Sequence, residues 1–176
     1  MMQAFLSDLV MRFEGLENQL NILDAATGDG DHGATILKGL KAAAAATDAP
    51  DKAFRRAAGG ASGSLFAVVI AALDKAQAGD DLGAALAQAA ERITMLGQAK
   101  PGDKTMLDAL IPASKAASPQ AAAQAAANGR DATREMAAKR GRAKYVEGAG
   151  VGHVDAGAPS IAEILAAFAE YSETAP

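Results

Sequence analysis

The chain has 176 residues and a net charge of −4, and half of its residues are hydrophobic although only 4% are aromatic. This length predicts a single domain over residues 1–176, and the abundance of alanine favours closely packed helices. The negative charge argues against a general nucleic-acid-binding protein, and a sequence without cysteine has no disulfide or thiolate chemistry.

An apolar stripe runs through the N-terminal residues and predicts a first helix. Its members alternate spacings of three and four, as on one helix face: Leu6, Leu9, Phe13, Leu16, Leu20 and Leu23. Asp8, Arg12 and Glu14 lie among them, which argues against a signal peptide. No stretch reaches the roughly 18 apolar residues of a membrane span. We therefore expect a soluble, cytoplasmic protein without membrane contact.

The loop after this helix places Asp24, Asp29 and Asp31 within eight positions. Carboxylates this close repel each other unless a cation shares them. Their oxygens suit Mg²⁺, which usually binds a few carboxylates together with substrate phosphates. The spacing does not fit an EF-hand, because Ala34 and Leu40 stand where that loop needs Gly and Glu. An Asp- and Gly-rich surface turn is the alternative interpretation.

A second helix is expected over about residues 34–46. The glycines at positions 28, 30 and 33 allow the chain ahead of it to turn sharply and to approach a ligand. Backbone N–H groups at a helix start attract phosphate. The acidic loop and this helix start together predict a metal–nucleotide site.

A glycine-rich turn, residues 59–64, leads into an apolar run over residues 65–73. The β-branched residues of the run are compatible with a buried strand, but its length, its alanine content and the lack of other strand candidates favour a buried helix. The turn offers N–H groups and the Ser62 hydroxyl to an anion. A close helix–helix contact that only small residues permit explains the same turn equally well.

A further helix is expected over about residues 83–96. Residues 97–106 nearly match a P-loop, but Asp103 intrudes between glycine and lysine and no hydrophobic strand precedes it, which excludes a Walker A site. Asp103 is instead predicted to cap the helix that carries residues 106–111. Pro112 should kink that helix.

The C-terminal third predicts helices over residues 119–128, 133–139 and 160–171. Ser160 and Glu163 have the spacing of a capping box at the start of the last one. The glycine-rich residues 148–152 lack the preceding strand and third glycine of a dinucleotide fingerprint and are interpreted as a loop.

A basic cluster occupies residues 139–144. Such a cluster commonly forms a solvated helix end. Arg142 is alternatively a candidate phosphate ligand, because a planar guanidinium binds oxyanions through two hydrogen bonds.

Taken together, these motifs resemble the L subunit of dihydroxyacetone kinase and the matching C-terminal domain of ATP-dependent dihydroxyacetone kinases. Five motifs occur in the order found in that family: Leu23-Asp24 with Gly28-Asp29-Gly30-Asp31-His32-Gly33, Gly59-Gly60-Ala61-Ser62-Gly63, Pro101-Gly102-Asp103-Lys104-Thr105-Met106-Leu107-Asp108, Gly141-Arg142-Ala143-Lys144-Tyr145 and Asp155-Ala156-Gly157-Ala158. Each is weak alone, but the ordered set is specific.

The resemblance implies an all-α fold, an antiparallel barrel of about eight helices with the nucleotide site at one open end. It implies that Asp24, Asp29 and Asp31 hold two Mg²⁺ ions that bridge the phosphates of ADP or ATP. The implied nucleotide-binding residues are His32, Gly33, Ala34, Thr35, Ala61, Ser62, Gly63, Gly97, Met106, Arg142, Asp155, Ala156 and Gly157. Gly97 and Met106 would line the base side, and Arg142 would offset charge during transfer.

The sequence departs from the family pattern at Ala156, where proline is common, and at Lys144, where a small residue is usual. Shortened helices or loops are also expected around residues 48–56 and 116–130.

The resemblance implies half of a kinase, which passes phosphate to dihydroxyacetone held on a separate K subunit. In one version ADP is a retained cofactor, recharged by the phosphohistidine M subunit of the phosphotransferase system. In another, ATP exchanges as a substrate. A third interpretation is a nucleotide-loaded adaptor that binds a partner such as a transcription regulator. A relationship to the N-terminal domain of fatty acid kinases is a weaker alternative.

Overall fold

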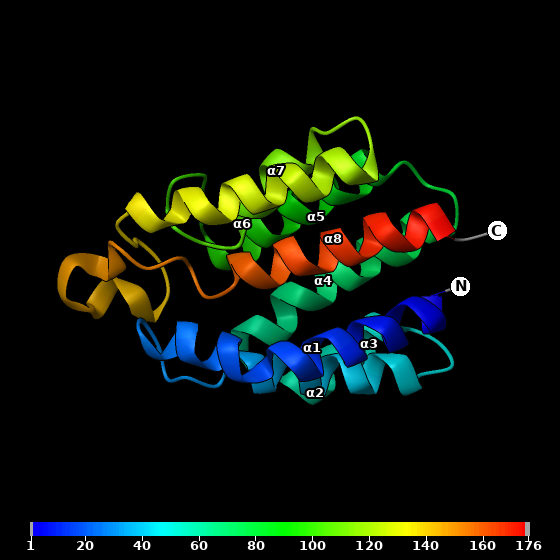
Figure 1. Ribbon diagram of the computed structural model, residues 1–176, viewed down its shortest axis with the longest axis horizontal. Helices are drawn as coiled ribbons and strands as arrows, with labels where there is room; N and C mark the ends of the chain where they lie inside the picture. Colours follow the sequence, from blue (N-terminus) through cyan, green and yellow to red (C-terminus); the bar gives the residue numbers. More distant parts are fainter. Residues whose placement is uncertain (1, 175–176) are drawn as a thin grey trace.

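The computed structural model describes residues 2–174, and these residues form helices without any strand (Figure 1). The helices are α1 (Met2–Ala25), α2 (His32–Ala45), α3 (Pro50–Ala58), α4 (Gly60–Gln77), α5 (Leu82–Gly97), α6 (Leu107–Ser114), α7 (Pro119–Ala132), the short 3₁₀ helices η1 (Thr133–Glu135), η2 (Arg142–Tyr145) and η3 (Glu147–Gly150), and α8 (Ala158–Thr174). Within the described chain, none is long and apolar enough to cross a lipid bilayer.

The eight α-helices form a closed ring. Each packs against the next in sequence, and α8 returns to pack against α1. Both ends of the chain lie at one end of this barrel, whereas the loop after α1 and the segment that contains η1, η2 and η3 lie at the other (Figure 1). The predicted helical barrel is confirmed.

The barrel core combines a few aromatic rings with many small aliphatic side chains. Phe5 on α1 meets Phe168 on α8 edge to face, with 5.5 Å between ring centroids, which helps close the ring. Along the predicted stripe of α1, Leu6, Leu9, Phe13 and Leu20 are buried. Small residues allow close helix contacts elsewhere. A Cβ on Gly129 of α7 would lie 2.1 Å from the Asp108 carbonyl oxygen on α6, so only glycine fits there.

The helix predicted over residues 133–139 is wrong. Only η1 forms, and residues 136–139 are non-helical. The reason is tertiary: the Thr133 carbonyl accepts a hydrogen bond from Lys104 Nζ at 2.7 Å, and the Lys139 N–H donates to the Asp103 carbonyl at 3.1 Å. These long-range bonds replace those that a continuing helix would have made.

Both predicted caps are also wrong. Helix α6 begins at Leu107, and Asp103 does not cap it. The Asp103 carboxylate instead accepts a hydrogen bond from the Lys100 N–H. Helix α8 begins at Ala158, so Ser160 lies inside it and binds the His32 ring instead of capping. Helix α3, which has Pro50 in its first turn, was not predicted from the sequence.

Candidate functional site

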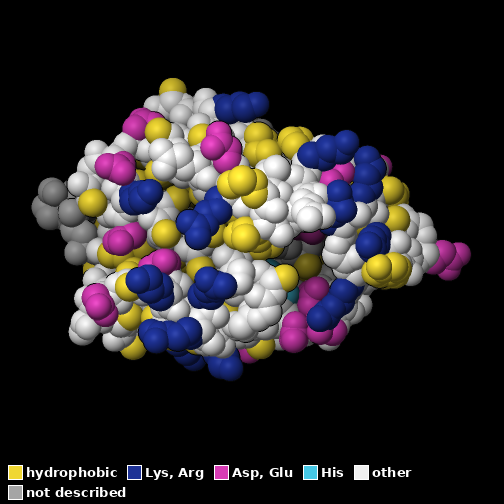
Figure 2. Space-filling model, turned by 180° about the vertical axis from the view of Figure 1, so that it is seen from behind, with side chains coloured by type: hydrophobic (Ala, Val, Ile, Leu, Met, Phe, Trp, Pro, Cys, Tyr) yellow, Lys and Arg dark blue, Asp and Glu magenta, His cyan; other side chains and the backbone are white. Residues whose placement is uncertain are grey.

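A cavity of about 500 Å³ opens at the end of the barrel opposite the chain ends. Its walls come from the loop after α1, the start of α4, the α5–α6 connection and the irregular segment before α8. From behind, acidic and basic side chains lie close together around a hollow at this end (Figure 2). The volume falls in the range of small-molecule sites.

The first wall is the acidic loop, residues 24–31, which is organised by its own first aspartate. Asp24 Oδ2 accepts hydrogen bonds from the N–H groups of Gly30 (3.0 Å), Asp31 (3.0 Å) and His32 (3.2 Å). Gly28 is needed for this arrangement, because a Cβ there would lie 2.4 Å from Asp24 Oδ1. The loop therefore folds around one carboxylate.

Asp24, Asp29 and Asp31 converge as predicted. One carboxylate oxygen from each lies within 4.8 Å of the others. Loss of solvent and the charges of Asp29 and Asp24 raise the pKa of Asp31. Clustered oxygen ligands that repel one another fit a hard divalent cation such as Mg²⁺.

Arg142 reaches this cluster from η2. Its guanidinium contacts the Asp29 carboxylate, and this hydrogen bond is the main reason that the pKa of Asp29 is lowered. Both side chains are exposed, so the contact is screened by solvent. It places a positive charge beside the acidic loop.

The start of α2 is used differently from the prediction. The N–H of His32 donates to Asp24, and that of Ala34 to the Asn21 side chain at 3.1 Å. Gly33 packs against α1, where a Cβ would lie 2.2 Å from the Glu17 carbonyl oxygen. Thr35 lines the cavity, but Gly33 and Ala34 do not. Protein groups already satisfy the N–H groups of His32 and Ala34.

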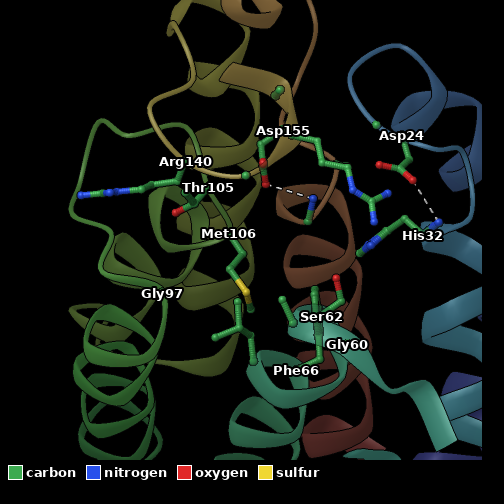
Figure 3. Close-up of a pocket in the computed structure, with 18 of the residues that line it drawn as sticks. Asp24, His32, Gly60, Ser62, Phe66, Gly97, Thr105, Met106, Arg140 and Asp155 are labelled. Carbon is green, nitrogen blue, oxygen red and sulfur yellow. Dashed lines mark hydrogen bonds between the residues drawn. The ribbon is translucent and has the colours of Figure 1, made fainter. Parts of the chain in front are cut away.

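His32 lines the cavity with a ring that is nearly buried. Its Nε2 lies 2.9 Å from Ser160 Oγ, and its ring centroid is 5.6 Å from that of Phe66. Burial lowers the pKa of His32 despite the nearby charge of Asp24. The ring is thus a neutral link from α2 to α4 and α8, visible opposite Asp155 in Figure 3.

The start of α4 faces the cavity with Gly60, Ala61 and Ser62. Gly59 precedes them at φ +68°, a left-handed conformation that favours glycine. Gly63 does not line the cavity, and its N–H donates to the Gly59 carbonyl. The N–H groups of a first turn have no acceptor within their own helix, and the helix dipole favours an anion there. This helix start is better placed for phosphate than that of α2.

An apolar wall continues from α4 to the α5–α6 connection. It comprises Leu65, Phe66, Ile93, Gly97, Ala99, Met106 and Leu107. Gly97 and Met106 therefore lie on the same side of the cavity, and their role beside the base of a nucleotide stays a prediction. Figure 3 shows Met106 and Phe66 across from the acidic loop.

Asp155 lines the cavity together with Ala156 and Gly157. Its Oδ2 accepts hydrogen bonds from the N–H groups of Gly157 and Ala158, both at 2.9 Å, and so caps α8. Burial raises the pKa of Asp155 to about 6, although these hydrogen bonds oppose the shift. Proline at position 156 is not needed for this cap.

Four polar residues of the cavity were missed: Thr27, Lys104, Thr105 and Arg140. Lys104 and Thr105 belong to the near-P-loop stretch, residues 97–106, where only Gly97 and Met106 were assigned to the site from the sequence. Arg140 was seen only as part of the basic cluster.

Known proteins match this chain along most of its length. Residues 26–170 match the DAK2 domain. The D-erythrulose kinase of Mycolicibacterium smegmatis is 36% identical over 179 residues, which cover 83% of this chain and 31% of that protein. Triokinase/FMN cyclase of Mus musculus is 34% identical, with coverages of 91% and 33%. The chain spans about a third of the length of these relatives.

The fold matches that of a solved kinase. The dihydroxyacetone kinase from C. freundii in complex with AMP-PNP and Mg²⁺ aligns with a TM-score of 0.71 and 26% identity, over 96% of this chain and 33% of that one. Its native form gives a TM-score of 0.70 and 27% identity, over 96% and 34% of the two chains.

Proposed function

This chain belongs to the DAK2 domain family, and we propose that it is the nucleotide- and magnesium-binding part of a dihydroxyacetone-type kinase. The observation that carries the proposal is the arrangement of the cavity. Three convergent carboxylates and the start of α4 face the same space, with an apolar wall beside them. A metal, a phosphate chain and a base require these three surfaces.

The residue roles follow from chemistry, and the number of metal ions follows from the resemblance to the L subunit. Asp24, Asp29 and Asp31 hold two Mg²⁺ ions, which when bound neutralise charge on the phosphates. The N–H groups of Ala61 and Ser62 bind phosphate oxygens at the start of α4. The wall with Gly97 and Met106 takes the base. Phosphoryl transfer needs positioning and charge compensation rather than covalent help from protein.

The acceptor is proposed to come from elsewhere. His32 is nearly buried against Ser160, so it is poorly placed to take a proton from a sugar. The matched relatives carry about two thirds of their length outside the aligned part. From the resemblance to the L subunit, we infer that a separate K subunit presents dihydroxyacetone, or a similar short ketose, to the open end of the barrel.

Two sources of phosphate remain candidates. The resemblance to the L subunit supports retained ADP that the phosphohistidine M subunit of the phosphotransferase system recharges. The C. freundii kinase was solved with AMP-PNP, an ATP analogue, which supports an exchanging ATP instead.

Nucleotide content distinguishes the two versions. Freshly purified protein is denatured, and the released nucleotide and metal are quantified. About one ADP per chain with Mg²⁺ supports the retained cofactor, and an empty protein stabilised thermally by Mg–ATP supports exchange. Asp29→Asn should abolish this stabilisation while the apo protein stays folded. A wild-type protein that neither carries nor responds to nucleotide contradicts the proposed function.

A further inference from the structure

Lys104 is a buried cation in an unusual backbone conformation. Its relative exposure is 2%, and its φ is +61°, which side-chain-bearing residues rarely adopt. A charged side chain is costly to bury unless its donors are satisfied. Strained backbone of this kind persists where the surrounding structure demands it and often marks functional regions.

The ammonium group of Lys104 binds three main-chain carbonyls. Nζ donates to the Thr133 oxygen at 2.7 Å, to the Gly150 oxygen at 2.9 Å and to the His153 oxygen. An ammonium group has three N–H donors, so all are used. Lys104 touches the cavity but has no donor left for a phosphate. Its effect on a ligand must therefore be indirect.

All three acceptors belong to one stretch, residues 133–155, here named the cap segment. The neighbouring residue in sequence, Asp103, also contacts the cap segment. Its carbonyl accepts the Lys139 N–H at 3.1 Å, and its carboxylate lies 3.6 Å from Arg140 Nε. The cap segment also carries Arg142 and Asp155, two of the groups that face the cavity.

The cap segment has little regular structure to hold its shape. Between η1 and α8 it contains only the 3₁₀ turns η2 and η3, and Gly148, Ala149 and Gly150 all have positive φ. Carbonyls at 133, 150 and 153 meet at one ammonium group, so Lys104 fixes the two ends of the segment against each other. Arg142 lies in the loop between these two ends.

We propose that Lys104 is a positioning residue: it gathers the two ends of the cap segment so that Arg142 and Asp155 are held against the cavity. The proposal rests on the proposed function, because the positioning by Lys104 is expected to increase the affinity for nucleotide. A purely structural role would stabilise the barrel as a whole. Positioning instead predicts an effect confined to the cap segment and to the ligand.

The test compares Lys104→Met with Lys100→Met in the full chain. Lys100 is the matched control, because its side chain is exposed in the same loop and, among residues 2–174, only its main chain is hydrogen-bonded. Amide hydrogen exchange is measured without nucleotide, and Mg–ATP affinity is measured by calorimetry. Lys104→Gln and Lys104→Arg are measured alongside, so that the test does not depend on the folding of one variant.

For Lys104→Met we expect exchange to be at least about tenfold faster at Ala138, Lys139 and Gly152. The N–H groups of Ala138 and Gly152 donate to carbonyls within the cap segment, and that of Lys139 donates to the Asp103 carbonyl. Exchange in α1 and α2 stays at the control level, and Mg–ATP affinity falls about tenfold or more. Lys104→Arg restores part of both, because it keeps the charge and several donors.

Unchanged exchange in the cap segment would overturn the proposal, as would acceleration by equal factors in every helix. If wild-type protein fails to bind Mg–ATP, the proposed function fails. The exchange pattern without nucleotide still decides whether Lys104 fixes the cap segment.

Discussion

The acidic loop and the cap segment form two walls of one cavity, yet they are built in opposite ways. The acidic loop takes its shape from contacts within nine residues, through Asp24 and the N–H groups up to His32. The cap segment is tied to Lys104, which is 29 to 49 positions away from its three acceptors. A local carboxylate organises one wall and a distant ammonium group the other. Apart from the Arg142–Asp29 contact that joins the two walls, a substitution in one wall should therefore leave the structure of the other wall unchanged.

The largest effect is expected for Asp24→Ala. It removes a ligand and the acceptor of three N–H groups at once, so we expect Mg–nucleotide affinity to fall at least about 100-fold and stability to fall by about 2–3 kcal/mol. Calorimetry and urea unfolding measure the two effects. Asp74→Ala, an exposed residue on α4, is the control. An intact cap segment in the Asp24 variant, seen by hydrogen exchange, is required if the walls are independent.

Gly28→Ala should produce a smaller effect confined to the acidic loop. The new Cβ would meet Asp24 Oδ1 at 2.4 Å, so the carboxylate must move. We expect roughly tenfold weaker Mg²⁺-dependent nucleotide binding, equivalent to about 1.4 kcal/mol. Gly15→Ala is the control, since nothing lies within 4 Å of its added Cβ. Equal affinities for the two variants would show that the close approach at Gly28 has no role in the site.

A third effect, of similar size, concerns pH and the cap segment. The pKa of Asp155 is about 6 in the folded protein and near 3.8 when unfolded, so the folded state binds more protons between these values. Its contribution to stability is therefore highest below pH 3.8 and is lost as pH rises through 6. Asp155→Asn keeps a cap acceptor for α8 and removes this titration.

We expect wild-type stability to lose about 1–2 kcal/mol relative to Asp155→Asn between pH 4 and pH 7, allowing for partial solvent access. Urea unfolding of both proteins across this range measures the difference. Parallel pH profiles would contradict the raised pKa. Asp74→Asn controls for loss of a carboxylate at an exposed position of α4.

The difference between local and long-range contacts also explains which parts of the structure could be predicted from the sequence. The stripe of Leu6, Leu9 and Phe13 predicts its helix because helical spacing is local, and Asp24, Asp29 and Asp31 are recognisable because they are close together in sequence. The helix predicted over residues 133–139 was wrong because its carbonyl and N–H partners, Lys104 and Asp103, lie far along the chain. Nothing in local spacing shows that a lysine will be buried.

Caps show the same difference on a smaller scale. Ser160 and Glu163 have the spacing of a capping box, but the structure uses Ser160 to hold His32 and caps α8 with Asp155. The choice depends on where α2 packs, which no nearby residue reveals. Thirteen of the predicted site residues still line the cavity, and the three that do not are Gly33, Ala34 and Gly63.

The most direct test of the account is amide hydrogen exchange of the wild-type protein with and without Mg–ADP. If one metal–nucleotide complex lies between the two walls, protection should rise in both residues 24–35 and residues 133–157, as well as at the start of α4. It should require both Mg²⁺ and nucleotide. Protection of neither wall, or protection confined to the end of the barrel near the chain ends, would contradict the assignment of this cavity as the nucleotide site.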